Sequence, residues 1–227
     1  MKQIIAMGGG GFSMEPDNPA LDDYILNQVD KENPKICFVP TASGDTDSYI
    51  ERFYDFFKQK PCKPSHLSLF KPSTRELRNF VLDQDILYVG GGSTKNMLVL
   101  WKEWGLVEIL QEALEKGVVL AGISAGAICW FEEGLTDSYG DELEPLPCLG
   151  ILKGSCCPHY DGEEKRRPTY LKNIEAGTMI PGYALDDGAA VHFVDGELKK
   201  VVRSRPNAKA YYVQVTNGKV EEKELKR

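Results

Sequence analysis

A serine between two glycines stands where an apolar run gives way to small residues. Residues 118–121 form an unbroken apolar run, which is typical of a parallel strand buried on both faces. Gly122, Ser124 and Gly126 then give the pattern G-x-S-x-G, and the residues after it favour a helix. A strand that turns into a helix at its serine needs nearly bare neighbours and exposes the hydroxyl at the helix N-terminus. A serine that merely caps a helix fits the same letters, but the strand before it and the helix after it favour a nucleophile.

A nucleophilic serine needs a base, and the sequence offers three histidines. His66 and His192 lie in predicted strands, where a structural role is the simpler interpretation. His159 stands at a strand end before a turn, where the loops of a parallel sheet build sites, so we expect it to be the base. The neighbouring Cys156 and Cys157 raise the question of a metal. Vicinal cysteines do not easily face one ion and no second ligand pair exists, so we expect no metal.

Two glycine runs resemble nucleotide loops only superficially. The run at 8–11 lacks the third glycine of a dinucleotide fingerprint, and we expect no helix to start there. The run at 90–92 is followed by Ser93-Thr94-Lys95, without the G-K-[ST] order of a phosphate loop. Glycines at 90–92 instead suit one half of an oxyanion hole, because they let the backbone approach a reacting carbonyl. The amide after the nucleophile, that of Ala125, would supply the other half.

Composition excludes several classes of protein. The 227 residues are 42% hydrophobic, which predicts one domain over 1–227. The formal net charge is -7 without a basic cluster, so we expect no nucleic-acid partner. The N-terminal apolar stretch is too short for a signal peptide, and no run approaches membrane-spanning length. Six cysteines without a C-x-x-C pair are typical of reduced thiols, so we expect a cytoplasmic protein.

Periodicity predicts alternating strands and helices in the first two thirds of the chain. Strands are expected at 4–7, 36–39, 66–70, 85–89 and 118–123, and helices after Pro19, at 48–58, from an N-cap at Ser73, at 94–104 and at 106–116. Such alternation indicates right-handed β-α-β units, a parallel sheet and helices on both of its faces.

The pattern changes after the serine. Residues 131–149 are polar and acidic, which predicts a loop at the rim of a site. A charged helix is expected at 163–176, and strands at 155–160, 181–185, 189–194, 199–202 and 210–216. The last strand precedes Asn217-Gly218, a type I′ hairpin pattern. We expect these strands, some of them antiparallel, to extend the edge of the same sheet.

Three segments together resemble one known family. They are Gly90-Gly91-Gly92-Ser93-Thr94 after a strand, Gly122-Ile123-Ser124-Ala125-Gly126-Ala127, and Pro158-His159-Tyr160. Their order and separations are similar to those of the peptidase E family of serine peptidases, which includes cyanophycinase. The resemblance implies an α/β fold, a three-layer α/β/α sandwich with a mostly parallel sheet. That fold is like that of class I glutamine amidotransferases and flavodoxin. It also implies hydrolysis of short peptides or β-linked aspartyl polymers without a metal or cofactor.

The resemblance also implies roles. Ser124 would be the nucleophile, His159 the base, and the amides of Gly92 and Ala125 the oxyanion hole. The mechanism would be acyl transfer through an acyl-enzyme on the serine.

The family's acidic partner lies in a segment similar to Leu185-Asp186-Asp187-Gly188-Ala189-Ala190, where a glutamate often takes the second acidic position. Here that position is Asp187, one methylene shorter, and we take it as the acid. Asp137, in the segment after the serine helix, is the alternative.

Substrate choice follows from charge. In the aspartyl-dipeptidase branch of the peptidase E family, an arginine in the segment after the serine helix binds the substrate's side-chain carboxylate. The corresponding residues here, 128–137, contain three acids and no cation. Arg166 and Arg167 precede Pro168 and are expected to face solvent. We therefore expect a dipeptidase with a weakened preference for N-terminal aspartate. A serine esterase or amidase, a cyanophycinase-like hydrolase and a non-catalytic binding module stay open as alternatives, and a homodimer is possible.

Overall fold

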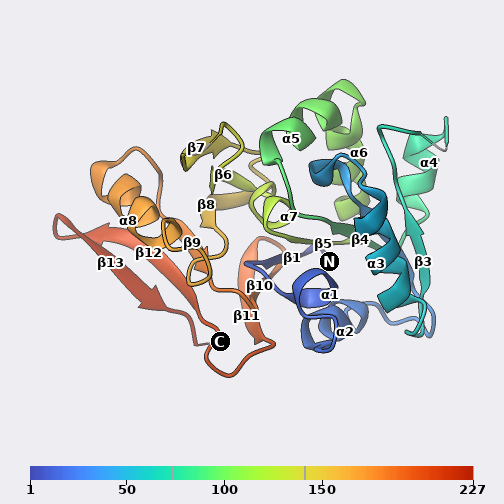
Figure 1. Ribbon diagram of the computed structural model, residues 1–227, viewed down its shortest axis with the longest axis horizontal. Coiled ribbons are helices and arrows are strands. Elements are labelled where there is room, and N and C mark those ends of the chain that lie inside the picture. The colour runs from blue at the N-terminus through green and yellow to red at the C-terminus, as the bar shows by residue number, and fades with distance from the viewer. Residues whose placement is uncertain (73, 141, 227) are drawn as a thin grey trace.

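Within residues 1–72, 74–140 and 142–226, which the computed structural model describes, seven strands form a central sheet (Figure 1). They are β1 (Gln3–Met7), β2 (Lys35–Val39), β3 (Lys63–His66), β4 (Ile86–Val89), β5 (Val119–Ile123), β10 (Ala189–Val194) and β11 (Glu197–Arg203). In the order β11-β10-β1-β5-β4-β2-β3, the strands from β1 to β3 are parallel, and β10 and β11 are antiparallel at one edge.

Helices cover both faces of this sheet, because alternate residues of each buried strand point to opposite sides. Ile5 and Met7 pack toward α1 (Gly11–Met14), α2 (Ala20–Leu26) and α3 (Asp47–Phe57). Ile4 and Ala6 pack toward the other layer. That layer holds α4 (Leu77–Leu82), α5 (Thr94–Glu103), α6 (Leu106–Glu115) and α7 (Ala125–Ile128). The expected three-layer α/β/α sandwich with a mostly parallel sheet is confirmed.

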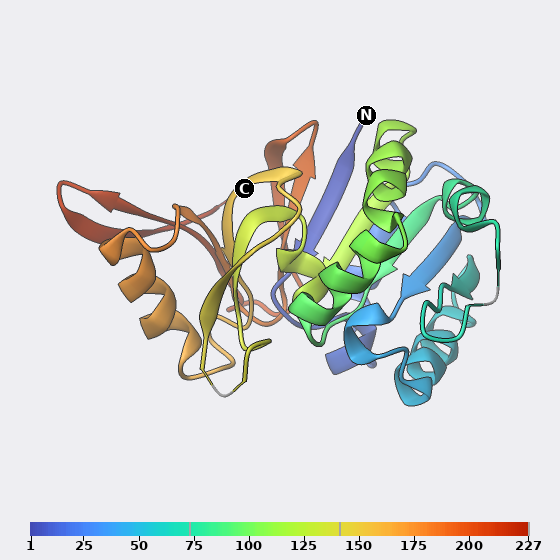
Figure 2. The same cartoon turned by 90° about the horizontal axis from the view of Figure 1, so that it is seen from above.

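Six further strands of the described chain form a second sheet in the order β13-β12-β9-β8-β6-β7. They are β6 (Phe131–Thr136), β7 (Glu144–Pro147), β8 (Leu152–Cys157), β9 (Gly182–Leu185), β12 (Ala210–Thr216) and β13 (Lys219–Glu224). Helix α8 (Arg166–Ala176) packs on this sheet through Tyr170 and Ile174, against Val213 and Ala184. Figure 2 shows this sheet and α8 standing beside the central sheet.

The expectation of a single sheet was wrong in its C-terminal part. Of the described strands after α7, only β10 and β11 extend the central sheet, and the others form the second one. The loop expected at 131–149 contains strands β6 and β7. Its acids hid the strand pattern because they have structural partners: Glu132 Oε2 accepts from the Gly154 amide at 2.7 Å, and Glu133 Oε1 accepts from the Ile180 amide. Pro145 and Pro147 place β7 at the sheet edge.

Element boundaries differ from the expectations in smaller ways. The strand expected at 66–70 lies earlier, as β3, and the one expected at 155–160 is β8. A short helix, α1, does begin within the first glycine run, at Gly11. Ser73, the expected N-cap, lies outside the described residues, and α4 begins at Leu77. The hairpin after β12 is confirmed, with positive φ at both Asn217 and Gly218.

The cysteines and the helices bear on the class of protein. All six cysteines lie in the described residues and are free thiols. Among the described helices, none combines the length and apolar character that a membrane crossing requires.

A buried carboxyl group lies under the first glycine run. Asp22 on α2 is fully buried, and burial raises its pKa from 3.8 to about 7, an effect that the Tyr88 hydroxyl partly opposes. A Cβ on Gly11 would stand 2.7 Å from Tyr88 Oη and 3.1 Å from Asp22 Oδ1, so the glycine lets α1 close over both groups.

We predict that Asp22 makes stability fall as the pH rises. Because its folded pKa is the higher one, its contribution is complete below 3.8 and is lost as the pH passes about 7. Between pH 5 and 8 the free energy of unfolding of the wild type should drop by roughly 2–3 kcal/mol relative to Asp22→Asn. Urea unfolding of both proteins at both pH values measures this. Parallel pH profiles would contradict it.

Candidate active site

Ser124 stands in a strained turn between β5 and α7. Its backbone has φ 56° and ψ -113°, a region that few non-glycine residues adopt, and its amide donates to Met7 O at 3.1 Å. The bare neighbours are required by space: a Cβ on Gly122 would lie 2.1 Å from Gly126 O, and one on Gly126 would lie 2.3 Å from Val89 O. The strand, turn and helix expected around the serine are therefore present.

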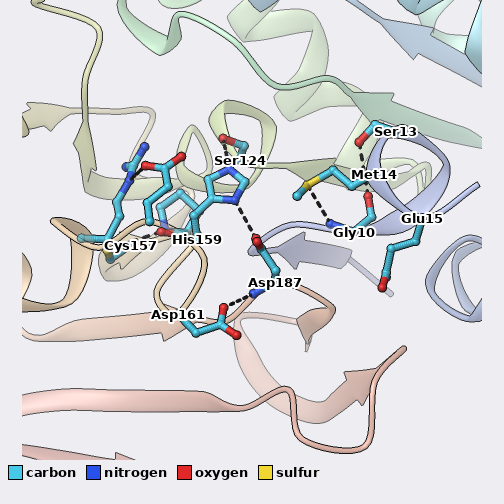
Figure 3. Close-up of polar contacts among 12 residues, drawn as sticks. Gly10, Ser13, Met14, Glu15, Ser124, Cys157, His159, Asp161 and Asp187 are labelled. Atoms are coloured by element: carbon cyan, nitrogen blue, oxygen red, sulfur yellow. Dashed lines mark hydrogen bonds and ion pairs between the residues drawn. The ribbon is translucent and has the colours of Figure 1, made fainter. Parts of the chain in front are cut away.

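His159 follows β8 of the second sheet, and its ring contacts Ser124 at the end of β5 in the central sheet. His159 Nε2 lies 2.9 Å from Ser124 Oγ, and Nδ1 lies 2.7 Å from Asp187 Oδ1 (Figure 3). An ionised carboxylate only accepts, so Nδ1 carries the proton when the ring is neutral, and Nε2 accepts from the serine hydroxyl. This tautomer leaves Nε2 as a base directed at the serine.

Asp187 lies on the short link between β9 and β10, where the chain passes from the second sheet to the central one. Its carboxylate is held between two glycines: a Cβ on Gly9 would stand 1.9 Å from Oδ1, and one on Gly162 would stand 2.1 Å from Oδ2. The Asp187 amide donates to Asp161 Oδ1 at 2.8 Å, and the Gly188 amide donates to Gly9 O at 2.8 Å.

These supports were missed by the sequence analysis. The first glycine run was weighed only as a phosphate loop, yet Gly9 is needed because the acid and the His159 ring occupy the space of its side chain. Asp161 and Gly162, two and three residues after the histidine, had no pattern of their own. The available indication was the glycine run at 8–11, because it follows β1, the strand that pairs with β5 before the serine.

The structure brings Asp187 rather than Asp137 to the histidine. Asp137 follows β6 with an exposed side chain and lines the same pocket as Ser124. The Nδ1 atom of His159 already bonds Asp187. Asp137 therefore lies at the pocket and not next to Nδ1 of His159.

The second glycine run borders the serine as expected. A Cβ on Gly91 would be 3.3 Å from Ser124 Cβ, and Gly92 has φ +136°, with space for a Cβ blocked by Ala42 O at 2.2 Å. The amide of Gly91 donates to Tyr49 Oη at 3.3 Å, and that of Ser93 to Ala42 O at 2.8 Å. Since the flanking amides are engaged, the Gly92 amide is the candidate donor from this loop.

A pocket of about 530 Å³ opens over the serine. It is lined by Gly92, Ser93, Ser124, Asp137, Ser138, Gly140, Glu163 and Arg166. The expectation that Arg166 faces solvent was wrong, because its side chain is only 4% exposed. Its Nε donates to Glu163 Oε2 at 2.6 Å and its Nη1 to Leu135 O at 2.8 Å. Pro168, in the first turn of α8, did not turn the arginine outward, since the carbonyl at the end of β6 binds it.

The other histidines lie away from this site. His66 Nδ1 is 2.8 Å from Tyr54 Oη, and the buried His192 Nδ1 is 2.8 Å from Tyr24 Oη. Burial, with the nearby Lys200, lowers the pKa of His192 to about 4, so it is neutral near pH 7. In the described part of the chain, no three His, Cys, Asp or Glu side chains are grouped so as to hold a metal ion.

We predict that Gly9→Ala disables the site while leaving the fold intact. The new methyl group would overlap Asp187 Oδ1 and displace it from His159. A displacement of a positioning group by about 1 Å lowers reaction rates by about a hundredfold. The rate of Ser124 modification by a fluorophosphonate measures the effect, and thermal unfolding checks the fold. A normal rate in a folded variant would show that Gly9 does not position the acid.

Comparison with known proteins places the chain in a family. The family model described as Peptidase family S51 matches residues 4–201. The uncharacterized peptidase YgaJ of Bacillus subtilis (strain 168) is 61% identical over 222 residues, 98% of this chain and 96% of the relative. Peptidase E of Pasteurella multocida (strain Pm70) is 23% identical and is covered over 89% of each chain. A crystal structure of a peptidase from an acI-B1 Actinobacterium shares the fold, with TM-score 0.72 at 17% identity over 99% of this chain and 94% of that one. The chain belongs to peptidase family S51.

Proposed function

We propose that this peptidase is a serine peptidase that hydrolyses short peptides through an acyl-enzyme on Ser124. The observation that carries the proposal is the continuous hydrogen-bonded chain from Ser124 through His159 to Asp187. Membership of family S51 supports peptide hydrolysis as the reaction.

In the proposed reaction, His159 Nε2 takes the hydroxyl proton as Ser124 Oγ attacks the peptide carbonyl. Asp187 stabilises the imidazolium that forms, at the 2.7 Å contact with Nδ1. The same Nε2 then gives its proton to the leaving amine. Water repeats the sequence on the acyl-enzyme, and the steps use only side chains, backbone amides and water.

The amides of Gly92 and Ala125 are the proposed donors to the oxyanion. Ala125 opens α7 directly after the serine, so its N–H lies on the side of the turn where the carbonyl oxygen would sit. Gly92 lines the pocket from the end of β4. Donors that are fixed before the reaction stabilise the developing charge without reorganisation.

The pocket charges favour a small peptide with a free amino end. When the bond after the first residue is cleaved, the α-ammonium group lies next to the reacting carbonyl. The described pocket lining carries two carboxylates, those of Asp137 and Glu163, and one guanidinium, that of Arg166, so its net negative charge complements that positive charge. A dipeptidase therefore fits this site better than an esterase for neutral substrates.

We predict that serine-directed phosphonates modify Ser124 alone. The base at 2.9 Å makes this hydroxyl more nucleophilic than other serines of the chain. Intact-mass spectrometry should find one adduct on the wild type and none on Ser124→Ala. An equal yield on both proteins would sink the proposed mechanism. Turnover of a panel of dipeptides and simple esters then separates a peptidase from an esterase.

We also predict unequal effects of the two acids. Asp187→Asn should lower the acylation rate by roughly 10³–10⁴-fold, because an amide that donates to Nδ1 imposes the wrong tautomer on His159. Asp137→Asn, the same substitution at the other candidate acid, should change the acylation rate far less and act mainly on KM. Pre-steady-state kinetics of both variants measures this. The reverse ranking would assign the acid role to Asp137.

A further inference from the structure

An ion pair forms part of the wall of the serine pocket. Glu163 lies in the turn after His159, with its amide donating to His159 O at 3.1 Å. Arg166 begins α8 three residues later, and its Nε donates to Glu163 Oε2 at 2.6 Å. The two side chains differ in burial: that of Arg166 is 4% exposed and that of Glu163 is 48% exposed. Glu163 is therefore the more solvent-exposed member of the pair.

The guanidinium of Arg166 is fixed in orientation. Its Nη1 donates to Leu135 O at 2.8 Å, at the end of β6, while Nε is bound by Glu163. An arginine has five N–H donors in a rigid fork, so donors beyond these two contacts are directed by the same fixed plane. Because Arg166 also lines the pocket, its remaining donors can meet a substrate group without any change of rotamer.

The charge of this wall is decided by Glu163. Among the described residues that line the pocket, one guanidinium stands with two carboxylates, those of Asp137 and Glu163. The positive charge of Arg166 is already paired with Glu163. A substrate carboxylate that approached it would also meet the negative charges of Asp137 and Glu163. Without Glu163, the buried guanidinium would offer an unshared charge-assisted contact.

We propose that Glu163 is a specificity-determining residue that sets this pocket against acidic first residues. It keeps Arg166 paired, so the peptides that the pocket accepts are short ones with an uncharged first side chain and a free α-ammonium group. The inference rests on the proposed function for the nature of the substrate. On this basis we expect no strong preference for aspartate, although the pocket contains a buried arginine.

The test compares Asp-Ala with Asn-Ala, which differ by one charge and little in shape. In the wild type, the ratio of their kcat/KM values should stay below about tenfold in favour of aspartate. In Glu163→Gln the amide oxygen still accepts from Arg166 Nε, but the negative charge is gone. The ratio should then rise by about tenfold or more, as expected when an unshared charge-assisted hydrogen bond becomes available.

Glu164→Gln is the matched control, because Glu164 is exposed, adjacent and outside the set of pocket residues. It removes the same charge and should leave the ratio as it is. In Glu163→Gln combined with Arg166→Gln the rise should vanish, with thermal unfolding as the check that this double variant is folded. A wild-type preference for aspartate beyond about a hundredfold, no rise in Glu163→Gln, or the same rise in Glu164→Gln would overturn the inference.

A binding measurement separates this inference from the proposed function. Calorimetric titration of Asp-Ala and Asn-Ala into Ser124→Ala, with and without Glu163→Gln, reports the same ratio without turnover. If the affinity ratio moves as expected but no protein cleaves either peptide, the serine peptidase proposal fails and the role of Glu163 stands. If the peptides are cleaved and neither ratio moves, only the role of Glu163 fails.

Discussion

The hydrogen bond between His159 and Ser124 is the interaction on which the whole site depends, because it joins the two sheets. Ser124 ends a strand of the central sheet, whereas His159 follows a strand of the second one. Asp187 lies on the link that carries the chain from β9 to β10. The 2.9 Å contact between His159 Nε2 and Ser124 Oγ exists only when both sheets hold their relative positions. The packing of each sheet therefore acts on the geometry of the serine.

The contact between His159 and Asp187 depends on the lack of side chains at two neighbouring glycines as much as on the two side chains themselves. The Asp187 carboxylate fits between the Cα atoms of Gly9 and Gly162, and its amide is tied to Asp161. The aspartate reaches His159 Nδ1 at 2.7 Å because the two glycines let the link approach the ring closely. Asp187 and the glycine after the end of β1, Gly9, therefore depend on each other.

The sequence was most informative where one local rule decides the structure. Apolar runs gave the central strands, and the spacing of Gly122, Ser124 and Gly126 gave the elbow, since a Cβ at either glycine has no space. The hairpin at 217–218 followed from its need for positive φ. These features depend on neighbours in the chain, which a sequence displays directly.

The rest depended on distant partners. Glu132 and Glu133 of β6 are typical of a loop by sequence, but they accept hydrogen bonds from the amides of Gly154 and Ile180. Arg166 is typical of a surface cation by sequence, but it is buried and donates to the carbonyl of Leu135. The choice between Asp187 and Asp137 was likewise a question of which strand end meets the histidine. Such contacts depend on how the strands of the second sheet pair, and no local sequence pattern predicts that pairing.

The positive φ angles at Ser124 and His159 have a consequence for how robust this protein can be. Both residues bear side chains in a backbone region that suits glycine, at φ 56° and 52°. Strain of this kind destabilises a fold by about 1–3 kcal/mol per residue. A chain optimised for thermal endurance alone would place glycine at both positions. The two residues that give this protein its proposed chemistry are thus also places where its fold is weaker than it could be.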